Sequence, residues 1–206
     1  MTITIAGIAG SLRRGSVNRL LLQEAGQQLP PGVRLAVFDL LDRVPPFNED
    51  WEADPAPLAV AELRQLIASA DGLLIATPEY NGSVPGQLKN ALDWASRPRG
   101  SAALLGKPAA VISASPRGQG AADAAADLRK ILTIAGASVI GTGLAVPRAF
   151  AQFTSDGQLA DPGLRRQLQA MTGELIQAAA DRRQYSGGPG ARSHPRPAGF
   201  QAGVIR

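Results

Sequence analysis

The chain alternates short, continuously apolar runs with stretches in which apolar residues recur at helical spacing. The apolar runs predict strands over residues 2–9, 33–38, 73–76, 109–113 and 138–146. Such runs are typical of strands that are buried on both faces of a parallel sheet. The helical spacing predicts helices over residues 17–29, 58–70, 84–97, 121–135 and 164–180. This alternation favours an α/β fold with three layers, in which helices cover both faces of a five-stranded parallel sheet.

The pattern contains no internal repeat and no second set of elements, so residues 1–185 are expected to form one domain. The connection over residues 39–57 is long and carries four prolines, which is typical of a functional or mobile loop. The segment over residues 186–206 is dense in Gly, Pro and Arg and has no periodicity. It is expected to be a disordered basic tail.

The charge of the chain is concentrated near its end. The 206 residues carry 21 Lys and Arg against 17 Asp and Glu, a net charge of +4. All 17 acidic residues precede Arg182, whereas five arginines lie from Arg182 onward. The body of the protein is therefore nearly neutral. A nucleic-acid surface would be built into the body, so no nucleic-acid partner is expected.

The residue types exclude several kinds of chemistry. The chain has no cysteine, which excludes disulfides, thiolate metal sites and a cysteine nucleophile. His194 is the one histidine, so a metal site built from several histidines is excluded, and a histidine-based triad is not favoured. No apolar run reaches the length of a membrane span, and no basic segment precedes the first apolar run as in a signal peptide. A cytoplasmic protein is expected.

The first predicted strand is followed by the loop GSLRRGSVN, residues 10–18. Gly10 and Gly15 have the G-x₄-G spacing of a P-loop, but Ser16 stands where a P-loop has its lysine. This pattern predicts a cradle for a phosphate monoester rather than for a triphosphate. The groups offered are the Ser11 and Ser16 hydroxyls, the Asn18 amide, the Arg13 guanidinium and the backbone N–H groups near Val17. The alternative is a serine-capped helix beside a surface arginine.

Two further loops follow predicted strands, TPEYNGSVPG after the third and SPRGQG after the fourth. Parallel strands end at the same edge of a sheet, so all three loops are expected to converge on one ligand. Asn81-Gly82 is also an ordinary turn dipeptide, and Tyr80 is either a core residue or an exposed one at the strand end. The sequence alone leaves these alternatives open.

Together the segments GSLRRGSVN, ADGLLIATPEYNGSVPGQLKNALDW and SASPRGQG resemble the NADPH-dependent FMN reductase family, a flavodoxin-like group that includes bacterial quinone, azo-dye and chromate reductases. The resemblance covers residues 2–136 and implies the flavodoxin strand order 2-1-3-4-5 with FMN at the switch point. It implies that the FMN phosphate is bound by Ser11, Arg13, Ser16, Val17 and Asn18. It implies that the isoalloxazine is lined by Pro78, Glu79, Tyr80, Asn81 and Gly82, with Ser115 and Gly118 on its other edge. The family often has Gly-Gly where this chain has Gly120-Ala121.

The resemblance also implies the chemistry. FMN would carry the redox step, with NADPH or NADH as hydride donor and a small-molecule acceptor such as a quinone, free flavin, azo dye or chromate. No catalytic acid or base and no metal is required of the protein. The alternative is a flavodoxin-like FMN electron carrier without NAD(P)H turnover, which the nearly neutral body disfavours.

Members of the family commonly form homodimers or homotetramers. The segment 84–97 is the candidate contact, with Trp94 either at the interface or in the core. Lys89 and Asp93 are expected to form an ion pair on the surface of this helix.

Overall fold

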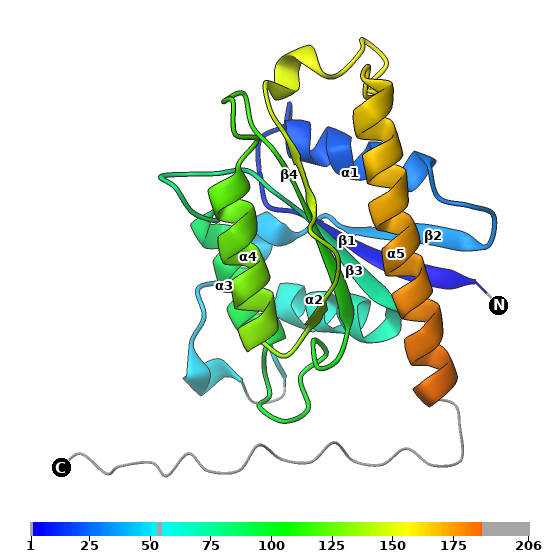
Figure 1. Cartoon of the computed structure of the whole chain (residues 1–206). Helices are drawn as coiled ribbons and strands as arrows, with labels where there is room; N and C mark the ends of the chain where they lie inside the picture. Colours follow the sequence, from blue (N-terminus) through cyan, green and yellow to red (C-terminus); the bar gives the residue numbers. More distant parts are fainter. Residues whose placement is uncertain (1, 53–54, 187–206) are drawn as a thin grey trace.

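A single twisted sheet organises the molecule (Figure 1). The structure, a computed structural model, describes residues 2–52 and 55–186. The strands are β1 (Ile3–Ala9), β2 (Val33–Phe38), β3 (Gly72–Thr77), β4 (Pro108–Ala114), β5 (Ser138–Val139) and β6 (Leu144–Val146). Their order is β2-β1-β3-β4-β5, β6 also pairs with β4, and every pairing is parallel. This is the flavodoxin-like order that the resemblance implied.

Helices cover both faces of the sheet, as the alternating pattern predicted. They are α1 (Val17–Gln27), α2 (Leu58–Ser69), α3 (Gly86–Ala95), α4 (Ala122–Ile134) and α5 (Pro162–Ser186). One core cluster joins the sheet to α1 and α5, and a second cluster joins it to α2, α3 and α4. The central strands β3 and β4 are buried along their whole length, which explains their continuously apolar sequences.

The fifth predicted strand differs from the structure. The sequence predicted one strand over residues 138–146, whereas β5 and β6 are separate strands and residues 140–143 lie between them. Gly141 and Gly143 have positive φ angles of 54° and 82°. A Cβ atom on Gly143 would lie 2.7 Å from the carbonyl oxygen of Val111. The chain therefore runs alongside β4 too closely at Gly143 for a residue with a side chain, and the sheet formed by the described residues has six strands.

The long connection after β2 packs on α3. It includes the short helices η1 (Leu41–Arg43) and η2 (Glu49–Trp51). Trp94 is 0% exposed, its Nε1 donates to the carbonyl oxygen of Pro45 at 2.8 Å, and its ring meets Phe47 edge-on. The two alternatives for Trp94 are thus resolved in favour of the core. Lys89 and Asp93 form the expected ion pair at 2.7 Å.

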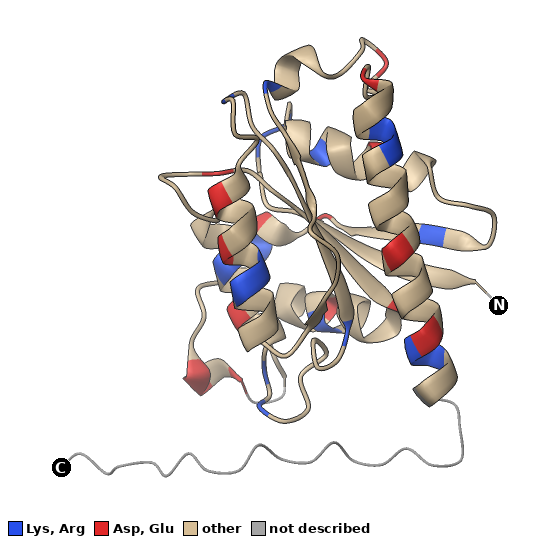
Figure 2. Ribbon diagram, in the orientation of Figure 1, with Lys and Arg blue, Asp and Glu red and all other residues tan. Residues whose placement is uncertain are grey.

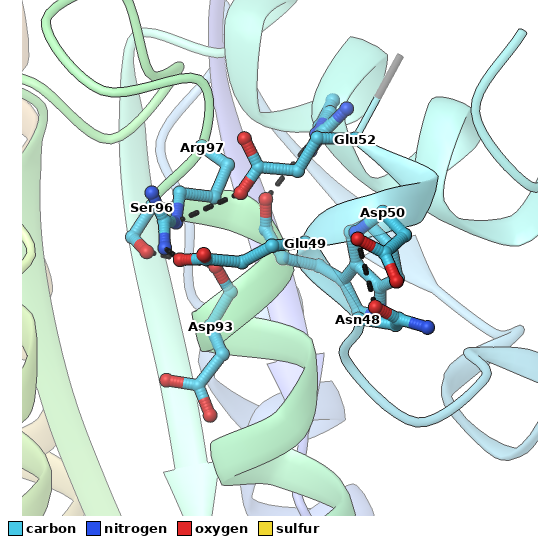
Figure 3. A network of polar contacts seen from close by, with 9 residues as sticks. Asn48, Glu49, Asp50, Glu52, Asp93, Ser96 and Arg97 are labelled. Atoms are coloured by element: carbon cyan, nitrogen blue, oxygen red, sulfur yellow. Dashed lines mark hydrogen bonds and ion pairs between the residues drawn. The ribbon is translucent and has the colours of Figure 1, made fainter. Parts of the chain in front are cut away.

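Arg97, just after α3, holds η2 against the helix (Figure 3). Its guanidinium pairs with Glu49, and its Nε lies 3.1 Å from an oxygen of Glu52. The side chain of Asn48 caps η2 by accepting from the N–H of Asp50 at 3.0 Å. These polar contacts hold residues 48–52 in place. None of these residues belongs to the loops that follow β1, β3 and β4.

The C-terminal helix is longer than the sequence pattern predicted, since α5 reaches Ser186 instead of Ala180. Near its end, Arg183 lies 3.5 Å from Asp71 and donates to the carbonyl oxygen of Thr2 at 3.1 Å. The predicted tail after Ser186 lies outside the described residues. Within the described ranges, no helix is both long and apolar enough to cross a membrane.

Candidate functional site

The loops after β1, β3 and β4 meet at the end of the sheet from which α1 and α4 begin (Figure 1). They enclose a small pocket of about 70 Å³. Nine of the twelve predicted site residues line it: Ser11, Arg13, Ser16, Val17, Asn18, Pro78, Glu79, Tyr80 and Ser115. The convergence predicted from the strand ends is therefore present, while Asn81, Gly82 and Gly118 are exposed and do not line the pocket.

The wall from the first loop is a set of hydrogen-bond donors. Ser16 is the N-cap of α1, and its Oγ accepts from the N–H of Arg19 at 3.2 Å. The N–H groups of Val17 and Asn18 have no acceptor within the helix, because a first helical turn lacks carbonyls four residues earlier. Ser11 is buried, and its Oγ accepts from the N–H of Arg13 at 3.4 Å. Both hydroxyl protons remain available to an anion.

The side chain of Asn18 does not have the role predicted from the sequence, which was to bind a phosphate with its amide. The side chain is 1% exposed, its Nδ2 donates to the carbonyl oxygen of Ala114 at 2.9 Å, and its Oδ1 accepts from the N–H of Ala114 at 2.9 Å. The amide predicted to face a phosphate is thus engaged with the end of β4. What Asn18 offers the pocket is its backbone N–H.

The third loop repeats the turn of the first. Ser115 Oγ accepts from the N–H of Arg117 at 3.2 Å, as Ser11 does from Arg13. Each of these two loops therefore has a buried serine followed two residues later by an exposed arginine. Arg13 lines the pocket, whereas Arg117 lies outside its lining, on the adjoining loop.

The second loop is a tight hairpin. Tyr80 and Ser83 exchange backbone hydrogen bonds of 3.0 and 3.2 Å around Asn81 and Gly82, whose φ angles are 52° and 78°. Two positive φ angles in a two-residue turn define type I′, so Asn-Gly forms the turn that its dipeptide signal allowed. Ser83 Oγ donates to Asp127 of α4 at 2.6 Å. Tyr80 is 47% exposed, which places it at the mouth of the pocket and not in the core.

The side chain of Glu79 caps the N-terminus of α4. Its Oε2 accepts from the N–H of Ala124 at 3.3 Å. The N-cap residue of α4 is Ala121, which has no side-chain acceptor and adopts a left-handed conformation with φ 65°. That conformation costs roughly 1–2 kcal/mol for a residue with a Cβ. The Ala121 methyl is only 2% exposed and does not line the pocket, so it does not narrow the opening.

Phe150 belongs to the pocket and was missed by the sequence reasoning. It lies in η3 (Ala149–Ala151), is 61% exposed and lines the pocket. Backbone bonds hold η3 against the third loop, from Ala149 N–H to Ser115 O at 2.9 Å and from Arg148 N–H to Arg117 O at 3.1 Å. The sequence could have pointed to Phe150, because it lies in the loop that follows the apolar run ending at Val146. Loops after parallel strands meet at the same edge of the sheet, so this loop also belongs near the ligand.

A shallow groove of about 360 Å³ adjoins the pocket and shares Arg13 and Tyr80 with it. Its other lining residues are mostly apolar or lack a charge: Gly10, Leu12, Pro85, Gly86 and Gln87. The site thus joins a small, donor-rich pocket to a larger open surface that an aromatic ring system can cover.

The site offers little for acid–base or nucleophilic catalysis by side chains. Among the described residues that line the pocket, Glu79 is the one carboxylate, and it already accepts from the N–H of Ala124. Among the described residues, no cluster of acidic or histidine side chains could hold a metal ion. The arrangement suits the binding of a phosphorylated cofactor that brings its own reactivity.

The chain is similar in sequence and in structure to known flavin-dependent reductases. Residues 3–151 match the family model of NADPH-dependent FMN reductases. An NAD(P)H-dependent FMN reductase of Pseudomonas aeruginosa is 42% identical over 174 residues, which are 82% of this chain and 93% of that protein. A 2-hydroxy-1,4-benzoquinone reductase of Burkholderia sp. is 45% identical over 133 residues, 64% of this chain and 70% of that protein. The flavoenzyme NAD(P)H:(acceptor) oxidoreductase FerB of Paracoccus denitrificans superposes with a TM-score of 0.80 at 32% identity, over 87% of this chain and 98% of that one.

Proposed function

Since this chain belongs to the NADPH-dependent FMN reductase family, we propose that it is an FMN-dependent oxidoreductase that oxidises NAD(P)H and reduces a small-molecule acceptor of the quinone class. The relatives named as FMN and quinone reductases support the enzyme class. Bound FMN supplies the two-electron chemistry that links a nicotinamide donor to a quinone. The residues of the chain bind, orient and expose that cofactor.

The observation that carries this proposal is the set of donors around the small pocket. The Ser11 and Ser16 hydroxyls, the N–H groups of Val17 and Asn18, and the Arg13 guanidinium all border it. No side chain of a described residue pairs with Arg13, and the phosphate of a flavin mononucleotide matches a donor set of this kind. The donor set therefore fits FMN.

The flavin ring is proposed to lie along the open surface beside the pocket. Leu12 and Tyr80 are exposed there, at 54% and 47%, although both are large apolar or aromatic residues. Pro78, Glu79 and Ser115 line the adjoining small pocket. Asn81, Gly82 and Gly118 are outside the small pocket, so we assign them to the outer rim of the ring site.

No side chain is assigned a proton-transfer step. The open face of the site is proposed to admit the nicotinamide donor first and the acceptor after the oxidised donor leaves. Such alternation predicts ping-pong kinetics, with parallel lines in double-reciprocal plots. A flavodoxin-like electron carrier would share the fold and the flavin but would show no steady oxidation of NADPH with a quinone, which separates the two functions.

We further propose a homodimer or homotetramer in the cytoplasm. A groove of about 520 Å³ lies between α3 and α4, and Leu105 and Ile134 at its edge are exposed. These side chains, and not the buried Trp94, are the candidate contacts with another copy. Light scattering of the purified protein measures the assembly, and a monomeric mass would reject this part of the proposal.

The function is tested by comparing FMN with riboflavin. Quenching of flavin fluorescence on addition of the protein without cofactor measures both affinities. The phosphate site predicts that FMN binds at least about tenfold more tightly, since charge-assisted hydrogen bonds are lost with riboflavin. Equal affinities, or no NAD(P)H oxidation by the FMN-loaded protein with a quinone, would reject the proposal.

A further inference from the structure

Two arginines at the rim of the site are held together without an acidic partner. Arg148 N–H donates to the carbonyl oxygen of Arg117 at 3.1 Å, so the two side chains start from adjoining backbone positions. Both residues are exposed. Neither guanidinium forms an ion pair or a side-chain hydrogen bond with any residue in the described ranges, whereas Arg19 and Arg97 each pair with a carboxylate.

The pair belongs to the rim and not to the pocket. Pro116 and Phe150 line the pocket, and they lie one residue before Arg117 and two residues after Arg148. Arg13 already borders the pocket itself. The structure therefore separates two sets of cations, one at the small pocket and one farther out on the third loop and η3. Figure 2 shows basic positions on the loops at this end of the molecule.

The backbone that presents Arg148 is unusual. Its φ and ψ angles are 49° and 43°, a left-handed conformation that residues with a Cβ avoid. The contact with Arg117, together with the Ala149 N–H to Ser115 O bond of 2.9 Å, holds it in place. Strained backbone persists only where the surroundings enforce it, and it gathers at ligand sites. Here it holds the backbone of Arg148 next to that of Arg117, so that both side chains start from the same side of the site.

We propose that Arg117 and Arg148 bind the 2′-phosphate of NADPH and so make the enzyme prefer NADPH to NADH. This inference rests on the proposed function, because it concerns the donor of that reaction. A 2′-phosphate is a monoester that carries up to two negative charges, matching two guanidinium groups, each of which can bind phosphate oxygens in a bidentate manner. Each phosphorus of the pyrophosphate carries one charge. The exposed ring of Phe150, two residues after Arg148, offers a face on which the adenine can stack.

The test compares NADPH and NADH in variants of the FMN-loaded enzyme. Arg117→Ala combined with Arg148→Asn removes both guanidinium groups, and asparagine tolerates the left-handed backbone at position 148. Anaerobic stopped-flow reduction of the flavin isolates the donor, since no acceptor is present. The second-order rate constant for flavin reduction by NADPH is expected to fall about 10- to 100-fold, because charged hydrogen bonds are lost. The rate constant for reduction by NADH is expected to change little.

A binding experiment gives a second readout that does not depend on turnover. Isothermal titration with 2′,5′-ADP and with ADP, which lacks the 2′-phosphate, is expected to show tighter binding of 2′,5′-ADP by the wild type and equal binding by the double variant. Arg117→Lys with Arg148→Lys is expected to restore part of the preference. Arg166→Ala, an exposed arginine on α5, serves as the control and is expected to change nothing.

The outcomes separate the two proposals. Equal losses with NADPH and NADH would place the arginines at the pyrophosphate and overturn the inference, as would an unchanged preference for NADPH or a wild type without any preference. The inference would also be overturned if the double variant were reduced by NADPH at the wild-type rate but passed electrons to an anionic acceptor more slowly. None of these results touches the proposed function, which fails only if FMN does not bind or NAD(P)H does not reduce it.

Discussion

Asn18 and Ala114 are joined by a reciprocal pair of hydrogen bonds, each 2.9 Å long, between one side-chain amide and both backbone groups of the other residue. Asn18 stands in the first turn of α1, and Ala114 is the last residue of β4. The pair therefore fixes the first loop against the start of the third loop. Its burial means that neither partner can replace the lost bonds with water.

Replacing Asn18 tests this connection. Asn18→Ala leaves the buried N–H and C=O of Ala114 without partners, which is expected to lower the free energy of unfolding by about 2–4 kcal/mol. Urea denaturation measures the loss. Asn18→Asp keeps the acceptor for the Ala114 N–H but buries a carboxylate oxygen against the Ala114 carbonyl oxygen, so a loss at least as large as that of Asn18→Ala is expected at neutral pH. A loss below about 0.5 kcal/mol for Asn18→Ala, the range of an ordinary surface change, would contradict the structural role.

Arg13 tests the phosphate site. Arg13→Ala is expected to weaken FMN binding about 10- to 100-fold, because a charged hydrogen-bond donor to the phosphate is lost. Riboflavin binding should not change, since riboflavin has no phosphate. Fluorescence titrations of the protein without cofactor measure both. Arg166→Ala is the matched control, and wild-type affinity for FMN in Arg13→Ala would refute the proposed cradle.

Glu79 is expected to position α4 and not to transfer protons. Glu79→Ala removes the acceptor for the Ala124 N–H, which should cost about 1 kcal/mol of stability, as for other lost helix caps. Glu79→Gln keeps an acceptor oxygen and should lose less. The dependence of turnover on pH should be the same in Glu79→Gln and the wild type. A new or missing ionisation in that profile would show that Glu79 acts chemically.

Replacing Tyr80 tests whether its side chain contributes to stability or to turnover. Because its side chain is 47% exposed at the tip of a hairpin, Tyr80→Ala should change the free energy of unfolding by no more than about 0.5 kcal/mol. Loss of its ring from the flavin edge should nevertheless alter kcat or the KM for the acceptor. Steady-state kinetics and urea denaturation are compared on the same preparation. A large loss of stability with unchanged kinetics would assign Tyr80 to packing alone.

Lys107 predicts a pH dependence of stability far from the site. It is 3% exposed, and its Nζ donates to the carbonyl oxygens of Ala68, in the last turn of α2, and Ala70, the C-cap residue of that helix. Burial lowers the pKa of Lys107 to about 8 from 10.5, helped by Arg182 and opposed by Asp71. Between these two pH values the unfolded chain binds more protons than the folded one, so stability from this group rises with pH.

The matching measurement compares the wild type with Lys107→Met in urea from pH 7.5 to 10.5. The difference in free energy of unfolding, wild type minus variant, is expected to shift in favour of the wild type as pH rises above about 8. Other titrating groups cancel in that difference. A difference that stays constant across the range would contradict the lowered pKa.

Local patterns predicted the elements because each central strand is buried on both faces and each helix has one apolar face. The start of α1 could also be predicted from local sequence, because its cap, Ser16, directly precedes the helix. The features that escaped prediction depend on residues far apart in the chain. Glu79 and Ala124 are 45 positions apart, and the break between β5 and β6 follows from the approach of Gly143 to Val111. The strand order itself came from the family resemblance and not from the pattern.

The central claim is that the strand-end pocket and its open rim hold FMN and expose it to NAD(P)H. The most direct test is an anaerobic titration of the FMN-reconstituted, desalted protein with NADPH, followed by addition of benzoquinone. The account predicts that the visible flavin absorbance is retained after desalting, bleaches as NADPH is added and returns with the quinone. A protein that keeps no flavin, or whose absorbance does not change with either NADPH or NADH, would contradict it.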